Sequence, residues 1–386
     1  MQGRAVYELM FELIGCAVCG KELSDKISSE LTPEVLRELY ELSKRQDLTH
    51  IIAEALLSAD LIPNGAIKDG FAKQKMAAVY RYTQIKYELA RLTAALDEAK
   101  IKHILLKGSV IRRYYPRPEL RTSCDIDVYV DEADIPRASE VLEKKLSYRF
   151  DLRSAHDVAY YSESKTHVEL HFDLIENDSD TKKMLSKLWD GAVRESEYGY
   201  VMSREMLVAY NIAHMAKHFV SGGCGIRPFI DLWILKNKMG YDEKKAEALL
   251  SDAGLTTFAK TVMRLSDVWF SGAEHTALTR EVEEYILGAT LYGSTENRVA
   301  ISEAKRGGKG KHLISRIFLP YNKLKRIYPR LEKYPILLPF YEVKRWGRLL
   351  FGKRAKRAIR ELRTSATLSD EKKERILSMW DALELY

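Results

Sequence analysis

Short apolar runs that are typical of β-strands alternate with helical segments between residues 100 and 175, whereas the chain on either side reads as helix. Strands interleaved with helices are typical of an α/β unit. Because helical regions precede and follow this unit, the chain as a whole is predicted to have an α+β fold. The predicted strands are IKHILLKG (101–108), DIDVYV (125–130), VAYYS (158–162) and THVELHFDL (166–174).

Two helices are predicted before the α/β unit. The sequence LTPEVLRELYELSKRQ begins with Thr32 as its cap and Pro33 at the first helical position. The segment from about Phe71 to Lys100 has no internal glycine or proline and has apolar residues at three- and four-residue spacing, which predicts one long amphipathic helix. These apolar residues are Met76, Val79, Tyr80, Tyr87, Leu89, Leu92 and Leu96.

The changes in pattern divide the chain into four predicted segments. A helical region comes first, then the α/β core, then a helical domain, and last a basic extension rich in aromatic residues. Their predicted limits are residues 1–99, 100–200, 201–304 and 305–386.

The net positive charge of the chain is concentrated in the basic extension. From Lys305 to Arg363 there are 19 basic residues and three acidic ones, and RGGKGK at 306–311 is predicted to be a flexible linker. Basic and aromatic side chains in alternation suit RNA or another single-stranded nucleic acid as partner. They suit equally an amphipathic helix on an anionic surface, or a face that packs on the acidic remainder of the chain.

The chain is predicted to be cytoplasmic. Its N-terminal apolar stretch is interrupted by Glu8 and Glu12, unlike a secretory signal. No apolar run approaches the ~20 residues of a membrane-spanning helix. Four cysteines are too few and too scattered for a disulfide framework. Cys16 and Cys19 are predicted to mark a buried face of a short helix, because no second CxxC or histidine pair stands near them to complete a zinc site.

Two aspartates, Asp125 and Asp127, are separated by one residue on a predicted strand. Side chains alternate along a strand, so both point to the same side, about 6.5–7 Å apart along the backbone. At about 6–7 Å, two like charges repel by roughly 2–3 kcal/mol at an effective dielectric near 20. A cation removes this cost, so the pair predicts a divalent metal site. The alternative, an exposed edge strand with solvated acids, is disfavoured by the apolar residues on the other face.

A third carboxylate is predicted to join this pair from the strand VELHFDL. Glu169, His171 and Asp173 alternate along it and therefore share one face. Hard Mg²⁺ takes a few carboxylates and leaves its other positions to water and phosphate oxygens. A lone glutamate on a strand is often merely solvated. His171 either pairs with the carboxylates or caps the sheet face, and Asp173 is expected to be structural.

Several motifs, taken in order, resemble the polymerase-β type of nucleotidyltransferase. Within that superfamily the chain looks most like the bacterial group of largely uncharacterised nucleotidyltransferase-like proteins, over about residues 70–240. The resemblance implies a core with a mixed sheet. The matching residues are Lys107-Gly108-Ser109, Tyr115-Pro116, Arg121, Asp125-Ile126-Asp127, Glu169-Leu170-His171, then His214 and His218, Arg227 and Asp231.

The resemblance implies a role for each matched residue. Asp125, Asp127 and Glu169 would be catalytic and would ligate two Mg²⁺ ions, with Mn²⁺ as an alternative. Gly108 and Ser109 would hold the phosphates of an NTP through backbone N–H groups and a hydroxyl. The other residues assigned to nucleotide binding are Lys107, Arg121, His171, His214 and Lys217.

Two alternative readings concern residues at the edges of this set. Arg121 could instead neutralise acids or support the loop before Asp125. Arg227 and Asp231, four residues apart at the start of a helix, are expected to pair with each other, an interaction worth only ~0.3–0.5 kcal/mol if exposed.

The predicted activity is transfer of a nucleoside monophosphate from an NTP to an acceptor hydroxyl, with release of pyrophosphate. The acceptor is a small molecule, a protein or an RNA, and the sequence does not choose among them. The alternative is a degenerate nucleotidyltransferase fold that binds a nucleotide or RNA without catalysis. The intact set of three carboxylates disfavours that alternative, since a binding module does not need them.

Overall fold

The computed structural model describes residues 2–175, 180–288, 330–351 and 369–385, together with residues 297, 299, 321, 324, 325 and 328. These residues form two compact units. The first unit contains Met1–Met215 and Ile226–Thr279, and the second contains Ala216–Gly225 and Arg280–Tyr386. The RGGKGK linker and 39 of the 82 residues of the basic extension lie outside the described residues, so the predictions made for them stay predictions.

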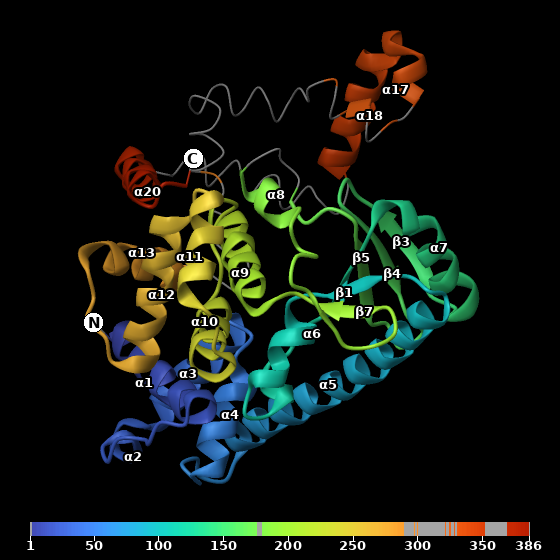
Figure 1. Cartoon of the computed structure of the whole chain (residues 1–386). Helices are drawn as coiled ribbons and strands as arrows, with labels where there is room; N and C mark the ends of the chain where they lie inside the picture. The colour runs from blue at the N-terminus through green and yellow to red at the C-terminus, as the bar shows by residue number, and fades with distance from the viewer. Residues whose placement is uncertain are drawn as a thin grey trace. The chain divides into compact units, whose positions relative to one another are not determined.

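A seven-stranded mixed sheet forms the centre of the first unit, with strand order β3-β4-β5-β2-β1-β7-β6. Two neighbouring pairs, β2 with β5 and β1 with β7, are parallel, and the other pairs are antiparallel. The α+β fold class and the mixed sheet are therefore confirmed (Figure 1). The strands are β1 His103–Leu105, β2 Asp125–Val130, β3 Arg149–Arg153, β4 Asp157–Tyr161, β5 His167–His171, β6 Val193–Arg194 and β7 Gly199–Val201.

Alternation along the two central strands divides the sheet into an apolar face and a polar face. Ile126, Val128 and Val130 of β2 are fully buried, as are Val168 and Leu170 of β5. The acidic residues of both strands lie on the opposite face. Strand β5 ends at His171, so the expected continuation of its polar face to Asp173 is wrong: Asp173 lies beyond the strand and binds Lys182 at 2.6 Å.

The long helix predicted before the core is α5, Ala66–Glu98, which runs along the sheet and contacts β2 and β7 (Figure 1). The predicted apolar stripe, however, is only partly the buried one. Met76, Tyr80 and Tyr87 are more than half exposed. The buried side of α5 instead follows residues spaced by seven: Phe71, Ala78, Ile85 and Leu92. Alanine counts little in an apolar pattern, yet its small side chain lets the helix approach its neighbours at Ala78.

The helices before α5 follow the predicted signals. The hydroxyl of Thr32 accepts a hydrogen bond from the Val35 N–H and caps α3, and Pro33 is its first residue. Cys19 is buried in a π-helical turn and Cys16 is half-buried, in agreement with the predicted placement of both residues on a short helix. These elements are α1 Gln2–Ile14, η1 Gly15–Cys19, α2 Ile27–Glu30, α3 Pro33–Arg45 and α4 Thr49–Ser58.

Short helical turns connect the strands, and longer helices follow them. The connections are α6 Gly108–Ile111, η2 Arg112–Tyr114, η3 Pro118–Leu120, η4 Glu132–Asp134, α7 Ile135–Glu140 and η5 Val141–Lys145. After the sheet come α8 Asp180–Leu185, α9 Arg204–Phe219, α10 Arg227–Ile234, η6 Leu235–Met239, α11 Glu243–Asp252, α12 Thr256–Ser271 and α13 Ala277–Leu287.

The described parts of the second unit are mainly helical. Leu324, Tyr328, Leu331 and Tyr341 form a small apolar cluster there. Among the described residues of the whole chain, no helix has the length and apolar character needed to cross a membrane. The remaining elements are α17 Arg330–Lys333, η7 Pro335–Leu337, α18 Leu338–Phe351 and α20 Asp370–Ala382.

Candidate active site

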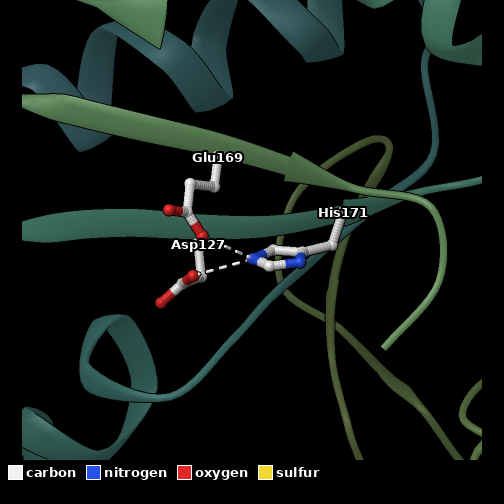
Figure 2. A group of neighbouring side chains, drawn as sticks. All are labelled: Asp127, Glu169 and His171. Atoms are coloured by element: carbon white, nitrogen blue, oxygen red, sulfur yellow. Dashed lines mark hydrogen bonds and ion pairs between the residues drawn. The ribbon is translucent and has the colours of Figure 1, made fainter. Parts of the chain in front are cut away.

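Two parallel neighbouring strands bring the predicted carboxylates together on the polar face of the sheet. In the register of β2 with β5, Asp127 lies opposite Glu169, and Asp125 lies opposite His167. His171 follows Glu169 two residues later and lies on the same face. Ligand atoms of Asp127, Glu169 and His171 lie within 4.8 Å of one another (Figure 2). Residues more than 40 positions apart in the sequence thus form one cluster.

Asp127 is the most tightly held member of this cluster. The Lys107 ammonium donates to its Oδ1 at 3.0 Å, and the Nε2 of His171 contacts the same oxygen at 2.8 Å. Burial alone would raise the pKa of Asp127, but these two partners hold that pKa well below its usual range. Asp127 is therefore ionised at neutral pH and carries a full negative charge in a buried position.

His171 pairs with the carboxylates, as one of its two predicted roles required. Its Nε2 lies 3.2 Å from Glu169 Oε2 as well as 2.8 Å from Asp127 Oδ1. Burial would lower the pKa of His171, but hydrogen bonds to Asp127 and Glu169 raise that pKa to about 9. The imidazole is thus held by two negative groups at once.

The charged form of Asp125 is disfavoured by its surroundings. Burial and the neighbouring charge of Asp127 raise the pKa of Asp125 to about 6, with Glu169 adding to the effect and Lys107 opposing it. The three carboxylates are contacted by Lys107, His171 and His167, while Arg121, whose charge also acts on Asp125, is paired with Asp231. The cluster therefore has an excess of negative charge that a bound cation would balance.

The turn before this cluster has an unusual backbone conformation. Helix α6 begins at Gly108, and Lys107 is its N-cap residue. Lys107 has a φ of 45° and a ψ of −122°, a conformation that residues with a side chain rarely adopt. The strained turn brings the Lys107 side chain back to Asp127 across the end of β1.

The side chain of Ser109 is left available by this arrangement. Its backbone N–H donates to the Leu106 carbonyl at 3.1 Å, so that N–H is used inside the turn. Its hydroxyl is buried and has no hydrogen-bond partner among the described residues. A buried hydroxyl without a partner costs stability unless a ligand or water satisfies it. Gly108 is closely surrounded: a Cβ there would lie 3.4 Å from both Arg112 and Ser123.

Arg121 belongs to a second buried cluster centred on Asp231 of α10. Its Nε donates to both carboxylate oxygens of Asp231 at 2.7 and 3.0 Å, and the Tyr115 hydroxyl donates to Oδ1 at 2.7 Å. The predicted pairing of Arg227 with Asp231 is wrong, because Arg227 pairs with Asp47. A buried carboxylate needs buried donors, and the segment before β2 supplies them.

The two remaining predicted contacts lie on α9. The ring of His214 is tilted by 51° relative to the ring of Tyr210, and the two ring centres are 6.1 Å apart. Lys217 belongs to the second compact unit. A nucleotide contact for either residue stays a prediction.

Tyr210 is a site residue that the sequence patterns did not identify. It is fully buried, and burial raises the pKa of its hydroxyl, on which the charges of Lys107, Asp127 and Glu169 also act. Its position one helical turn before His214 was the only available signal, since a tyrosine on an apolar helix face otherwise looks like core.

The donor set of the cluster fits a divalent cation. Two carboxylates and one imidazole converge from adjacent strands, and Asp125 is two residues from Asp127 on the same face. Such a set leaves coordination positions for phosphate oxygens or water.

The α+β fold, with a mixed sheet that brings carboxylates of two adjacent parallel strands together, agrees with the nucleotidyltransferase core that the sequence motifs resemble. The sequence comparison agrees: residues 33–271 match the family model described as "Uncharacterised nucleotidyltransferase", and the chain belongs to this family. Comparisons with curated proteins and with solved structures gave no significant match.

Proposed function

We propose that this protein is a divalent-metal-dependent enzyme that transfers a nucleoside monophosphate from an NTP to an acceptor hydroxyl and releases pyrophosphate. The observation that carries the proposal is the excess of carboxylates over cations in the cluster of Asp125, Asp127 and Glu169, of which Asp127 is buried and the other two are half-buried. A purely structural cluster would be neutralised within the protein. Membership of a nucleotidyltransferase family supports the class of reaction.

In this proposal Asp125, Asp127 and Glu169 hold the metal ions, of which two are expected. The bound metal supplies charge stabilisation at the reacting phosphate and a template for in-line displacement. The acceptor oxygen forms a bond to the α-phosphorus, and the bond from that phosphorus to the oxygen bridging to the β-phosphate breaks. Glu169 orients the acceptor hydroxyl and takes its proton.

The donor phosphates are proposed to contact the turn around Gly108. The Ser109 hydroxyl is positioned to donate to a phosphate oxygen, and Lys107 to exchange its bond with Asp127 for a phosphate once a metal ion neutralises that carboxylate. Arg121, whose charge acts on Asp125, would contribute to the same positive environment. A contact from His214 completes the proposed nucleotide-binding set of the first unit.

The proposal also includes a class of acceptor and a cellular location. The acceptor is an RNA, which the basic, aromatic-rich extension would suit, or a small molecule or a protein side chain, which fit the chemistry equally. A cytoplasmic location would give the enzyme access to NTPs.

The direct test is incubation of the full-length protein with Mg²⁺ or Mn²⁺ and each [α-³²P]NTP, with and without RNA, protein and small-molecule fractions of a cell extract. Label transfer and pyrophosphate release are expected together. The Asp125→Asn/Asp127→Asn double variant should lose the metal contribution of several kcal/mol, which is about 10³-fold in rate. Asp173→Asn is the matched control, because Asp173 is an acid of the same segment bound to Lys182 outside the cluster.

Transfer that persists in the double variant would overturn the assignment of the catalytic carboxylates. Binding of NTP without turnover across all acceptor fractions would instead favour the alternative function, a nucleotide- or RNA-binding module. Circular dichroism of both variants separates loss of activity from loss of fold.

A further inference from the structure

We infer that His171 is itself a ligand of the bound metal and that the site therefore binds Mn²⁺ in preference to Mg²⁺. The inference rests on the proposed function only in placing a divalent cation at the carboxylate cluster. It goes beyond that function because nucleotidyl transfer by carboxylates alone requires no nitrogen ligand.

The orientation of the His171 ring carries the first step. Figure 2 shows its Nε2 directed at the carboxylates of Asp127 and Glu169, while the residue itself lies on β5 and is buried. The nitrogen is 2.8 Å from Asp127 Oδ1 and 3.2 Å from Glu169 Oε2. Three potential ligand atoms from three side chains thus face a common point.

The spacing of these atoms is that of neighbouring ligands around one six-coordinate ion. In an octahedron with bonds of about 2.1 Å, adjacent ligand atoms are about 3.0 Å apart. The two measured separations, 2.8 and 3.2 Å, bracket this value. Small movements of the side chains would therefore suffice to accept a metal between them.

The other nitrogen of His171 does not oppose this role. Its Nδ1 is buried and has no hydrogen-bond partner among the residues that the structure describes. No protein donor therefore forces Nδ1 to be the unprotonated nitrogen. The ring is free to keep its proton on Nδ1 and to present the Nε2 lone pair to a metal.

The contact of the Lys107 ammonium with Asp127 shows that a cation is attracted to this carboxylate. The ammonium contacts the same Asp127 oxygen as His171 does, at 3.0 Å. Asp127 and Glu169 together require more positive charge than His171 provides. A divalent ion can replace the lysine at this oxygen and release it toward a phosphate.

The nitrogen ligand decides which ion is preferred. Mg²⁺ is a hard cation that takes oxygen ligands and gains little from imidazole, whereas transition metals bind imidazole well. Mn²⁺ combines an affinity for carboxylates and phosphates with acceptance of a histidine nitrogen. A site of two carboxylates, one imidazole and substrate oxygens therefore favours Mn²⁺.

The test is metal binding to the purified full-length protein without nucleotide, so it is independent of activity. Electron spin-echo envelope modulation of bound Mn²⁺ should show a directly coordinated ¹⁴N in the wild-type protein. Calorimetric titration should give Mn²⁺ an affinity at least about tenfold above that of Mg²⁺. His171→Gln should remove the ¹⁴N signal and weaken Mn²⁺ binding by about 10–100-fold, with a smaller effect on Mg²⁺.

His167→Gln is the matched control. His167 lies on the same strand and face, four residues earlier, opposite Asp125, and its Nδ1 contacts Glu169 at 3.4 Å. This variant should keep the ¹⁴N signal and the Mn²⁺ preference. Absence of the signal in the wild-type protein, or its persistence in His171→Gln, overturns the inference without any need for the variant to be active.

The outcome for the metal ligand and the outcome for the proposed function are distinguishable. A ¹⁴N-ligated Mn²⁺ without transfer of label from any NTP supports the metal site and contradicts the enzyme. Label transfer that proceeds with Mg²⁺ and without a nitrogen ligand supports the enzyme and overturns the role of His171.

Discussion

Two buried aspartates, Asp127 and Asp231, are held in different ways. They are similarly buried, at 4% and 5% exposed. Asp231 receives hydrogen bonds on its carboxylate from Arg121 and Tyr115, a cation and a neutral donor. Lys107 and His171 both contact the same oxygen of Asp127, Oδ1, and the carboxylates of Asp125 and Glu169 lie beside it. One cluster is balanced and the other is not.

The difference indicates that the Asp231 cluster stabilises the fold, whereas the Asp127 cluster can bind a ligand. A balanced buried pair holds elements together, here the segment before β2 and helix α10, and offers nothing to a ligand. An unbalanced cluster costs stability in the folded protein, and that cost is recovered when a cation binds. The two clusters should therefore respond in opposite directions to removal of a carboxylate.

Asp231→Ala is expected to have the largest effect on stability. The change leaves the buried Arg121 guanidinium without its acid, and breaking a buried pair in this way costs about 3–5 kcal/mol. Urea unfolding followed by circular dichroism measures the loss. Asp267→Ala is the control, because its partly exposed pair with Lys236 should contribute no more than about 1 kcal/mol. Equal losses in both variants would contradict a special role for the Asp231 cluster.

Asp125→Asn is expected to stabilise the metal-free protein while it removes activity. The pKa of Asp125 is raised to about 6 from a model-peptide value near 3.8, so above pH 6 the folded state carries an unfavourable charge. Removing that charge should raise the free energy of unfolding at pH 7 by up to about 3 kcal/mol. Metal-free thermal unfolding measures it. A decrease in stability would show that Asp125 is balanced within the protein after all.

The comparison of the Asp127 and Asp231 clusters also shows what could be predicted from the sequence. The strands β2 and β5 and the polar face of Asp125, Asp127 and Glu169 follow from a period of two, which is a local property. The partner of Asp231 does not follow from any such local property. Proximity in sequence favoured Arg227, whereas the partner is Arg121, 110 residues away, brought there by folding.

The same limit applies to α5 and to the site residue Tyr210. The long helix was predictable from its composition, but its buried side depends on which neighbours pack against it, and Tyr80 and Tyr87 ended on the exposed side. Tyr210 joins the site only because α9 packs near the sheet. Residue type and spacing alone do not contain these long-range contacts.

The Arg121 segment has a pH-dependent attachment to α4. His50 is buried and its Nε2 contacts the Leu120 carbonyl at 3.0 Å, and burial lowers the pKa of His50 to about 4. A base with a lowered pKa stays neutral when folded but takes up a proton when unfolded below pH 6.5. Its contribution is thus complete above pH 6.5 and should fall by about 2 kcal/mol between pH 6.5 and pH 5.

His50→Gln provides the comparison for this pH effect, since glutamine can still donate to the Leu120 carbonyl. The measured quantity is the difference in free energy of unfolding between wild type and variant, at pH 7 and at pH 5. That difference should shrink or reverse at pH 5, because only the wild type loses stability through this histidine. Parallel curves for the two proteins would assign the acid sensitivity to other groups.

Tyr115→Phe is the smallest change to the balanced cluster, because it removes one donor and leaves the ion pair intact. The loss should be about 1–2 kcal/mol, the usual cost of a hydrogen bond to a charged group. Combined with Asp231→Ala, however, it should add almost nothing, since the hydroxyl's partner is already gone. Urea unfolding of the two single variants and the double variant gives the coupling between them. Additive losses would mean that Tyr115 stabilises the fold by packing alone, and the Asp231 cluster would then reduce to its pair with Arg121.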